Sequence, residues 1–290
     1  MKFFPATKND QQYTQWRAKK LASVDRTLES RLIPIEDTAS LSEKERKRLA
    51  NDCQLHNFAL YALQNQSQIN KASIHKFALQ LGLKHLDNNL CADDDQLTSI
   101  TIAEHTGQHE YIPYTAKKLN WHTDGYYNTA NRQINGMLLH CVTPAAQGGE
   151  TYLLDHELAY LLLRDENPEY VNALFAKDAL TIPANIIDNN VIRPAQTGPV
   201  FSVDAHGRLH MRYSARLRNI EWKQDSLIHE ATDFLQQLWA TGSDLIVNHT
   251  LQAGQGVVCN NILHGRTDFE DNTDSNRLLY RGRYYESIKS

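Results

Sequence analysis

The segment GVVCNNILHG, residues 256–265, indicates the fold class of this chain. It is a short apolar run, partly β-branched, that stops at a glycine, which is typical of a buried strand. Comparable runs separated by turn residues recur from about residue 97 onward, namely LTSITIAEH, QINGMLLHCVTP, GGETYLLD, GRLHMRY and DLIVNHTL. Several antiparallel strands at this spacing favour a barrel or a sandwich. We therefore expect a mainly β core over residues 96–290.

The first ninety or so residues have a different pattern of charged and apolar residues, which we interpret as helical. The stretch SLSEKERKRLANDCQLHNFALYAL contains Ser42 followed three residues later by Glu45, the pattern of a capping box at a helix start. We predict a helical layer over residues 1–95 that packs on the β core. No composition shift marks a linker, so the two parts are expected to form one structural unit.

Two helical inserts are predicted inside the β-rich part. The first runs from about residue 155 through NPEYVNALFA, where Asn167 can cap and Pro168 can take the first helical position. The second is DSLIHEATDFLQQLWATG, with apolar residues along one face and Gly242 as its end.

Charge and composition exclude several classes of function. The formal net charge of −4 gives no excess of positive charge to attract nucleic acid or a membrane surface. No apolar run reaches 18 residues and the first residues lack a signal-peptide pattern, so we expect a soluble cytoplasmic protein. The oligomeric state stays open. The cysteines lie far apart without C-x-x-C pairing and are interpreted as buried or incidental thiols: Cys53, Cys91, Cys141 and Cys259.

A metal site is suggested by NWHTDGYY, residues 120–127. In an extended segment His122 and Asp124 point to the same side, and Thr123 points to the other. His264 is a candidate third ligand, because it ends an apolar run where a strand is expected to stop. Two histidines and one aspartate leave about three positions open on an octahedral metal, as expected of a non-haem Fe(II) site. A water-activating zinc with the same ligands remains an alternative.

Three motifs in order carry a resemblance to a known family. NWHTDG, then GGETYLLD, then HGRTDF and NRLLYRGRY follow one another with compatible spacings, and Arg277 lies 13 residues after His264. Over roughly residues 100–286 the chain closely resembles the Fe(II)/2-oxoglutarate-dependent dioxygenases of the taurine dioxygenase/TfdA superfamily, including the branch with gamma-butyrobetaine hydroxylase and clavaminate synthase.

The resemblance implies a role for five residues. His122, Asp124 and His264 match the three iron ligands, and Arg277 and Thr151 match the residues that hold the distal carboxylate of 2-oxoglutarate. It also implies a double-stranded β-helix, or jelly roll, with Fe(II), 2-oxoglutarate and O2 as cofactor and co-substrates. The implied reaction hydroxylates a small molecule and releases succinate and CO2.

Each assignment also has a purely structural interpretation. Thr151 could serve only as a strand residue, and Arg277 could pair with Asp271 or Asp274. Gly148 and Gly149 are interpreted as a turn. Trp121 is assigned to packing. Arg266 either faces solvent or braces a loop.

The main candidate for a contact with the substrate is Arg281, four residues after Arg277. On a regular strand both arginines share a face, about 13 Å apart at roughly 3.3 Å per residue. In taurine dioxygenase an arginine at the matching position meets the substrate sulfonate, so we hypothesise an anionic substrate read by Arg281. Pairing with Glu286 is the structural alternative. Further candidate contacts are Tyr126, Tyr127, Arg212 and Arg216.

Two other classes of function are kept open at this stage. One is a non-catalytic metal-binding jelly-roll sensor, and the other is a zinc-dependent hydrolase that uses the same triad. The predicted carboxylate-binding residues Thr151 and Arg277 count against the sensor, because a protein that only binds a metal does not need to bind a carboxylate.

Overall fold

The computed structural model describes residues 2–8, 10–24, 32–65, 69–87, 97–102, 111–272 and 276–288. The chain divides into two compact units and passes between them several times. Unit 1 comprises Met1–Val24, Asn120–Gln133 and Leu154–Ile246. Unit 2 comprises Asp25–Leu119, Ile134–Leu153 and Val247–Ser290.

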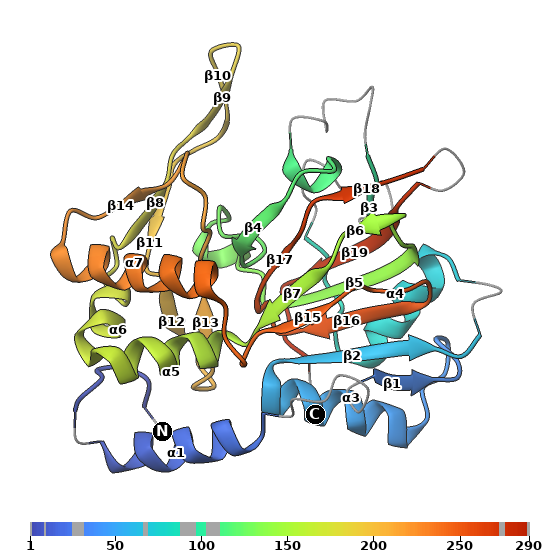
Figure 1. The fold of residues 1–290 in the computed structure, drawn as a ribbon, viewed down its shortest axis with the longest axis horizontal. Helices are drawn as coiled ribbons and strands as arrows, with labels where there is room; N and C mark the ends of the chain where they lie inside the picture. Colours follow the sequence, from blue (N-terminus) through green and yellow to red (C-terminus); the bar gives the residue numbers. More distant parts are fainter. Residues whose placement is uncertain are drawn as a thin grey trace. The chain divides into compact units, whose positions relative to one another are not determined.

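Unit 2 is built on a six-stranded sheet with the order β1-β2-β16-β5-β19-β3 (Figure 1). Strand β1 runs parallel to β2, whereas the pairs formed by β16 and β19 are antiparallel. The strands are β1 (Leu32–Ile35), β2 (Phe58–Leu63), β16 (Gln255–Cys259), β5 (Gly136–Thr143), β19 (Leu278–Tyr284) and β3 (Thr98–Ile100).

A second sheet of unit 2 contains β15 (Val247–His249), β7 (Thr151–Leu154) and β17 (Leu263–Arg266), in the order β15-β7-β17. Its residue Leu153 belongs to the same buried cluster as Met137, Leu139 and Val257 of the six-stranded sheet. The two sheets therefore pack face to face, which buries apolar side chains from both. A short pair, β6 (Gln147–Gly148) and β18 (Phe269–Glu270), lies beside them.

Helices cover the other face of the six-stranded sheet. They are α3 (Glu43–His56) and α4 (Lys71–Gln80), and their residues Leu49 and Phe77 pack in one cluster with Tyr61 and Val258 of the sheet. The capping box predicted at Ser42 is confirmed, because its side chain accepts from the Glu45 backbone while the Glu45 side chain accepts from the Ser42 backbone.

The prediction of a uniformly helical layer over the first ninety residues is wrong at two places. Helix α3 ends at His56, where Asn57 takes the left-handed conformation with φ 61°, and FALYAL then forms strand β2 instead of extending the helix. This run is apolar at every position and almost wholly buried, which suits a strand inside a sheet better than a one-sided helix. Strand β1 joins it at the edge of the sheet.

Unit 1 is mostly helical, with short strand pairs. Its helices are α1 (Gln11–Ala22), α5 (His156–Glu166), α6 (Pro168–Leu174) and α7 (Ser226–Thr241). The predicted cap Asn167, the predicted first residue Pro168 and the predicted end Gly242 are confirmed. Its strands are β8 (Leu180–Ile182), β9 (Asn185–Ile187), β10 (Asn190–Arg193), β11 (Gln196–Gly198), β12 (Phe201–Val203), β13 (Leu209–Met211) and β14 (Glu221–Trp222). The chain enters this unit at Asn120, within strand β4 (Leu119–His122), and the short helix η3 (Ala130–Arg132) follows. The short helix η2 (Ile112–Tyr114) belongs to unit 2.

Every apolar run that the sequence analysis assigned to the β core contains a strand. Three of the cysteines, Cys53, Cys141 and Cys259, are buried free thiols as predicted, and Cys91 lies outside the described residues. In the described parts of the chain, no helix combines the length and the apolar character needed to cross a membrane.

Candidate active site

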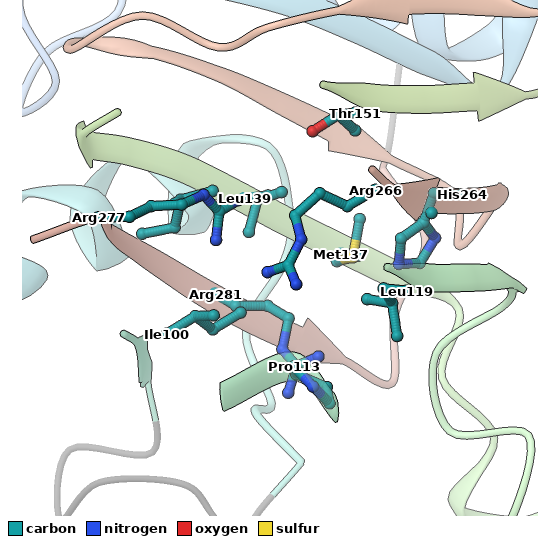
Figure 2. Close-up of a pocket in the computed structure, with 12 residues that line it drawn as sticks. Ile100, Pro113, Leu119, Met137, Leu139, Thr151, His264, Arg266, Arg277 and Arg281 are labelled. Carbon is teal, nitrogen blue, oxygen red and sulfur yellow. The ribbon is translucent and has the colours of Figure 1, made fainter. Parts of the chain in front are cut away.

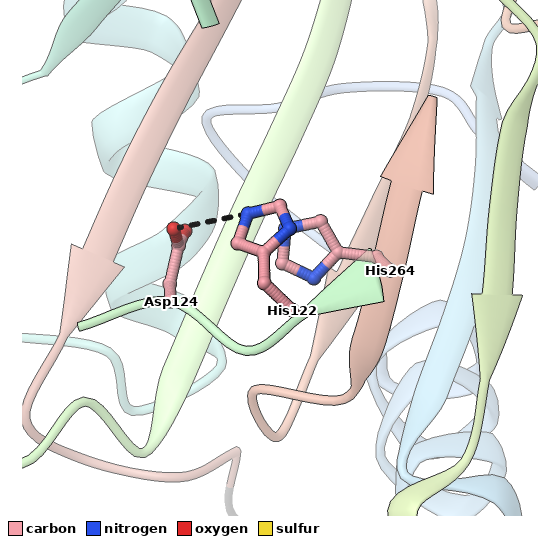
Figure 3. Close-up of side chains that lie close together, drawn as sticks. All are labelled: His122, Asp124 and His264. Carbon is pink, nitrogen blue, oxygen red and sulfur yellow. Dashed lines mark ion pairs between the residues drawn. The ribbon is translucent and has the colours of Figure 1, made fainter. Parts of the chain in front are cut away.

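His122 is the last residue of β4, and Asp124 lies in the turn that follows it. Both side chains are buried. Thr123 turns away and is held by Tyr213, because its N–H donates to the Tyr213 carbonyl at 3.0 Å and its hydroxyl accepts from the Tyr213 N–H at 3.1 Å. His122 Nε2 and Asp124 Oδ1 lie 4.0 Å apart, so the predicted common orientation is confirmed (Figure 3). That separation is too long for a hydrogen bond.

Packing fixes the strand that carries His122. The Trp121 ring stacks on Trp239 of helix α7 with a centroid distance of 4.5 Å, and Trp239 Nε1 donates to the Tyr213 hydroxyl at 3.0 Å. The interpretation of Trp121 as a packing residue is therefore confirmed.

His264 belongs to unit 2 and is buried within strand β17. The expectation that it lies where a strand stops is wrong in detail. Strand β16 ends at Cys259, Asn261 adopts φ 51° and donates from Nδ2 to the Ile134 carbonyl at 2.8 Å, and β17 starts at Leu263. Cys259 lies before this turn and packs in the core.

Both histidines present the same ring nitrogen to a carbonyl two residues earlier. His122 Nδ1 lies 2.8 Å from the Asn120 oxygen, and His264 Nδ1 lies 2.9 Å from the Ile262 oxygen. A carbonyl can only accept, so each Nδ1 carries the proton and each Nε2 keeps a lone pair. This is the tautomer and the supporting contact expected of metal-ligating histidines. Together with Asp124, these buried residues each offer one ligand atom.

A pocket of unit 2 gathers the other predicted residues (Figure 2). It holds about 440 Å³, counting the solvent at its mouth, and none of the described residues that line it is an aspartate or a glutamate. The polar side chains in its lining are Thr151, His264, Arg266, Arg277 and Arg281. Arg277 and Arg281 both line this pocket, although Arg277 precedes β19 and the register shifts between Leu278 and Leu279, so the regular strand assumed in the prediction is not present.

Arg277 lies directly before β19 and is buried. Its guanidinium carbon is 4.9 Å from the centre of the Phe269 ring, and within the described ranges it forms no ion pair. The alternative pairing with Asp271 is therefore absent, while Asp274 lies outside the described residues. Burial lowers the pKa of Arg277 to about 10, which still leaves it charged at neutral pH.

Gly148 and Gly149 precede Thr151 in the chain, and Gly149 lies close to Arg277. Their φ values are +72° and +71°, conformations that favour glycine; Gly148 is the last residue of strand β6 and Gly149 follows it, so the prediction of a turn is wrong in detail. A Cβ atom at Gly149 would lie 3.6 Å from the Nε of Arg277. Thr151 is the first residue of β7 and is buried with its side chain at the pocket.

Arg266 braces a loop, which was one of the two alternatives predicted for it. Its terminal nitrogen donates to the carbonyls of Thr115 at 2.8 Å and Lys117 at 2.6 Å, and its Nε donates to the Thr267 carbonyl at 3.1 Å. Its guanidinium carbon lies 4.5 Å from the centre of the Phe269 ring. The sequence analysis missed Phe269, which contacts two arginines; an aromatic residue in the polar run GRTDFED was the available signal.

Arg281 is a buried residue of β19, where it pairs with Leu139 of β5 and Thr98 of β3. The carboxylate of Glu286 is engaged elsewhere, because it accepts from the backbone N–H groups of Lys84 at 3.2 Å and His85 at 3.0 Å and contacts the His85 ring.

Tyr126 lies beside the predicted ligands of unit 1. It is buried, and its ring centre is 6.5 Å from that of His122. Arg212 acts as a brace for this residue, because Nε donates to the Tyr126 carbonyl at 2.7 Å while the terminal nitrogens donate to the carbonyls of Leu180 at 3.0 Å and Gln196 at 2.8 Å.

Comparison with known proteins assigns the class. The model of the family described as taurine catabolism dioxygenase TauD, TfdA family matches residues 19–283, and the chain belongs to this family. A uridine-5'-phosphate dioxygenase from Amycolatopsis sp is 34% identical over 203 residues, which are 65% of this chain and 68% of that protein. Another from Streptomyces sp is 29% identical over 209 residues, which are 69% and 73% of the two chains.

Solved structures show the same fold at low identity. An asparagine oxygenase in complex with Fe(II), 3-hydroxyasparagine and succinate has a TM-score of 0.60 at 18% identity, covering 95% of this chain and 92% of that one. The non-haem iron oxygenase OrfP in complex with Fe and alpha-ketoglutaric acid also has a TM-score of 0.60 at 18% identity, covering 85% and 81%. These likenesses confirm a mainly β fold with helical additions.

The protein is therefore an Fe(II)- and 2-oxoglutarate-dependent dioxygenase that acts on a small molecule. Family membership decides against the two other classes considered, the non-catalytic sensor and the zinc hydrolase.

Proposed function

We propose that this dioxygenase oxidises a small substrate that carries a phosphate group, with uridine 5'-phosphate as the first compound to test. Two relatives are named uridine-5'-phosphate dioxygenases. The observation that carries the proposal is the pocket of unit 2, whose described lining contains the buried residues Arg266, Arg277 and Arg281. A cluster of buried guanidinium groups favours anionic ligands.

His122, Asp124 and His264 hold the iron in this proposal. The fit rests on the donor set and on the two Nδ1 contacts, which direct a lone pair of each imidazole away from the backbone. Bound iron with 2-oxoglutarate supplies the oxidising chemistry, in which 2-oxoglutarate becomes succinate and CO2. We also assign the two facing sheets of unit 2 to the double-stranded β-helix expected from the sequence.

Arg277 and Thr151 hold the distal carboxylate of 2-oxoglutarate. A guanidinium can donate two parallel hydrogen bonds to one carboxylate, and a threonine hydroxyl can donate a third. Both side chains line the same pocket, and in the described ranges Arg277 forms no ion pair, although the charge of Asp271 acts on it. The Phe269 ring and Gly149 limit where its guanidinium can lie.

Arg281 is assigned to the anionic group of the substrate. Arg277 neutralises the distal carboxylate, and Arg266 is committed to three backbone carbonyls. Arg281 is buried in the lining of the same pocket, four residues after Arg277, which supports a contact with a ligand bound beside the co-substrate. Tyr126, buried beside His122, is assigned to exclude water and to limit the position of the substrate.

The test measures succinate formed by the protein loaded with Fe(II) under nitrogen and then supplied with 2-oxoglutarate and air. Uridine 5'-phosphate should raise succinate formation well above the rate without substrate, and uridine should do so weakly because it lacks the phosphate. His264→Ala serves as the inactive control. Equal succinate formation with and without uridine 5'-phosphate, in protein that binds both iron and 2-oxoglutarate, would exclude this substrate.

A further inference from the structure

The ring of Phe269 in unit 2 contacts two buried arginines. The guanidinium carbon of Arg266 lies 4.5 Å from the ring centre, and that of Arg277 lies 4.9 Å from it. Phe269 is itself only 6% exposed. A guanidinium group packs favourably on an aromatic ring, so the ring offers a surface against which the Arg277 side chain lies. The position of the ring therefore affects the position of the Arg277 guanidinium.

Backbone hydrogen bonds fix the segment that carries the ring. Phe269 belongs to strand β18 and pairs with Gly148 of strand β6. Its N–H donates to the Ala116 carbonyl at 3.0 Å, and the N–H of Gly149 donates to the Asp268 carbonyl at 3.0 Å. These bonds join the segment to two other parts of the same unit. The ring is therefore held in place without help from Arg277.

Arg266 is fixed on the same ring. Its guanidinium donates to the backbone carbonyls of Thr115, Lys117 and Thr267, so it cannot leave the ring without losing hydrogen bonds. Like charges repel one another, and the repulsion is stronger in a buried place than in water. The fixed positive charge of Arg266 therefore opposes a shift of Arg277 toward it.

Gly149 limits the Arg277 side chain at a second point. A Cβ atom at Gly149 would lie 3.6 Å from the Nε of Arg277 and 3.6 Å from the Cβ of Phe269, which are ordinary contact distances. The backbone of Gly149 thus lies next to both side chains. The ring, the fixed charge and the glycine backbone together leave the Arg277 guanidinium little freedom to move.

The place of this guanidinium matters because Arg277 and His264 line the same pocket of unit 2. Figure 2 shows the two side chains at opposite sides of the pocket. In the proposed function His264 belongs to the metal end of the pocket, and Arg277 holds the distal carboxylate of 2-oxoglutarate. The co-substrate must then reach from one to the other. The place of the guanidinium therefore sets the chain length of the keto acid that fits.

We propose that Phe269 determines the specificity for the co-substrate: by fixing the Arg277 guanidinium, it selects 2-oxoglutarate over 2-oxoadipate, which is one methylene group longer. A planar guanidinium donates two parallel hydrogen bonds to a carboxylate only within a narrow range of distance and orientation. The longer keto acid fits only if Arg277 moves back, and the ring prevents that movement. The inference rests on the proposed function, because it takes Arg277 to hold the distal carboxylate.

The test measures equilibrium binding of 2-oxoglutarate and of 2-oxoadipate to Fe(II)-loaded protein under nitrogen, by titration calorimetry. The wild type should bind 2-oxoglutarate about 10- to 200-fold more tightly, the range expected for one methylene group. Phe269→Leu, which removes the ring and leaves space beside Arg277, should lower this ratio several-fold. Phe269→Met fills more of that space without an aromatic face and should lower the ratio to a smaller extent. Phe269→Tyr keeps the ring and should keep the ratio of the wild type.

Phe77→Leu is the matched control, because it makes the same change at another buried phenylalanine of unit 2, whose ring lies 4.9 Å from that of Tyr61 between the ring centres. It should lower the melting temperature and leave the ratio of the two affinities unchanged. The inference is overturned if the wild type binds both keto acids equally, if Phe269→Leu and Phe269→Met keep the wild-type ratio, or if Phe77→Leu changes the ratio as much as Phe269→Leu does.

Arg277→Met, titrated in the same way, separates this inference from the proposed function. Weakened 2-oxoglutarate binding in Arg277→Met, together with an unchanged ratio in Phe269→Leu, rejects the inference and keeps the assignment of Arg277. Unchanged 2-oxoglutarate binding in Arg277→Met rejects both. Neither result depends on uridine 5'-phosphate, because the titrations contain no substrate.

Discussion

Replacing Arg277 with methionine should stabilise the protein in the absence of 2-oxoglutarate while weakening its binding of 2-oxoglutarate. Arg277 is 5% exposed, and burial lowers the pKa of its guanidinium to about 10. Each tenfold loss of proton affinity corresponds to about 1.4 kcal/mol, so the charged form costs the folded state on the order of 3 kcal/mol. Because the folded pKa lies below the unfolded one, this cost is fully present at neutral pH and is relieved only as pH rises above about 10.

The net gain is smaller than this cost because the guanidinium also contacts the Phe269 ring. Such a cation–π contact contributes roughly 0.5–2 kcal/mol, which leaves a net stabilisation of about 1–2 kcal/mol. For a chain of this size the melting temperature should rise by about 2–8 °C. The lost bidentate contact should weaken 2-oxoglutarate binding about 10- to 100-fold.

The measurements are thermal unfolding of the metal-free protein without 2-oxoglutarate, and titration of the iron-loaded protein with 2-oxoglutarate under nitrogen. Arg266→Met is the matched control. It removes a neighbouring arginine whose burial cost is at least as large, because burial lowers its pKa to about 9, but whose guanidinium donates to three backbone carbonyls. Loss of those donors offsets the relief, so the melting temperature of Arg266→Met should lie below that of Arg277→Met. The reasoning fails if Arg277→Met lowers the melting temperature, or if its affinity for 2-oxoglutarate is unchanged.

Four further predictions concern single side chains. His264→Ala should leave purified protein with far less than one iron per chain, and full iron retention would reject this ligand. Arg281→Ala should raise the KM for uridine 5'-phosphate more than that for 2-oxoglutarate, whereas equal increases would argue against a substrate role. Phe269→Leu should raise the KM for 2-oxoglutarate several-fold, and Phe269→Trp, which keeps an aromatic ring, should leave it near the wild-type value. An equal rise in both variants would show that the ring does not position Arg277. Burial lowers the pKa of His140 to about 4, so the folded state binds fewer protons than the unfolded state below about pH 6.5. Urea titrations should therefore show a loss of about 2 kcal/mol between pH 7 and pH 5 that His140→Gln lacks; an identical loss in the variant would contradict this cause.

Features that depend on a few neighbouring residues were predicted well from the sequence. The capping box at Ser42, the cap and first residue of α6 and the shared orientation of His122 and Asp124 each follow from local backbone geometry. The positions of the strands in the β-rich part also followed, because short apolar runs between turn residues specify strands without knowledge of their partners.

The tertiary structure decided the features that depend on distant partners. FALYAL became strand β2 because it pairs with β16, which lies almost 200 residues later in the chain. Arg277 has no ion pair with Asp271 although the two are close in sequence, and Arg193 reaches Tyr127 across 66 residues. Periodicity and capping act over a few residues, whereas burial and charge neutralisation depend on which segments the fold brings together. The sequence therefore supplied the candidate residues of the site, and only the structure could show that Arg266 and Arg212 are committed to backbone carbonyls.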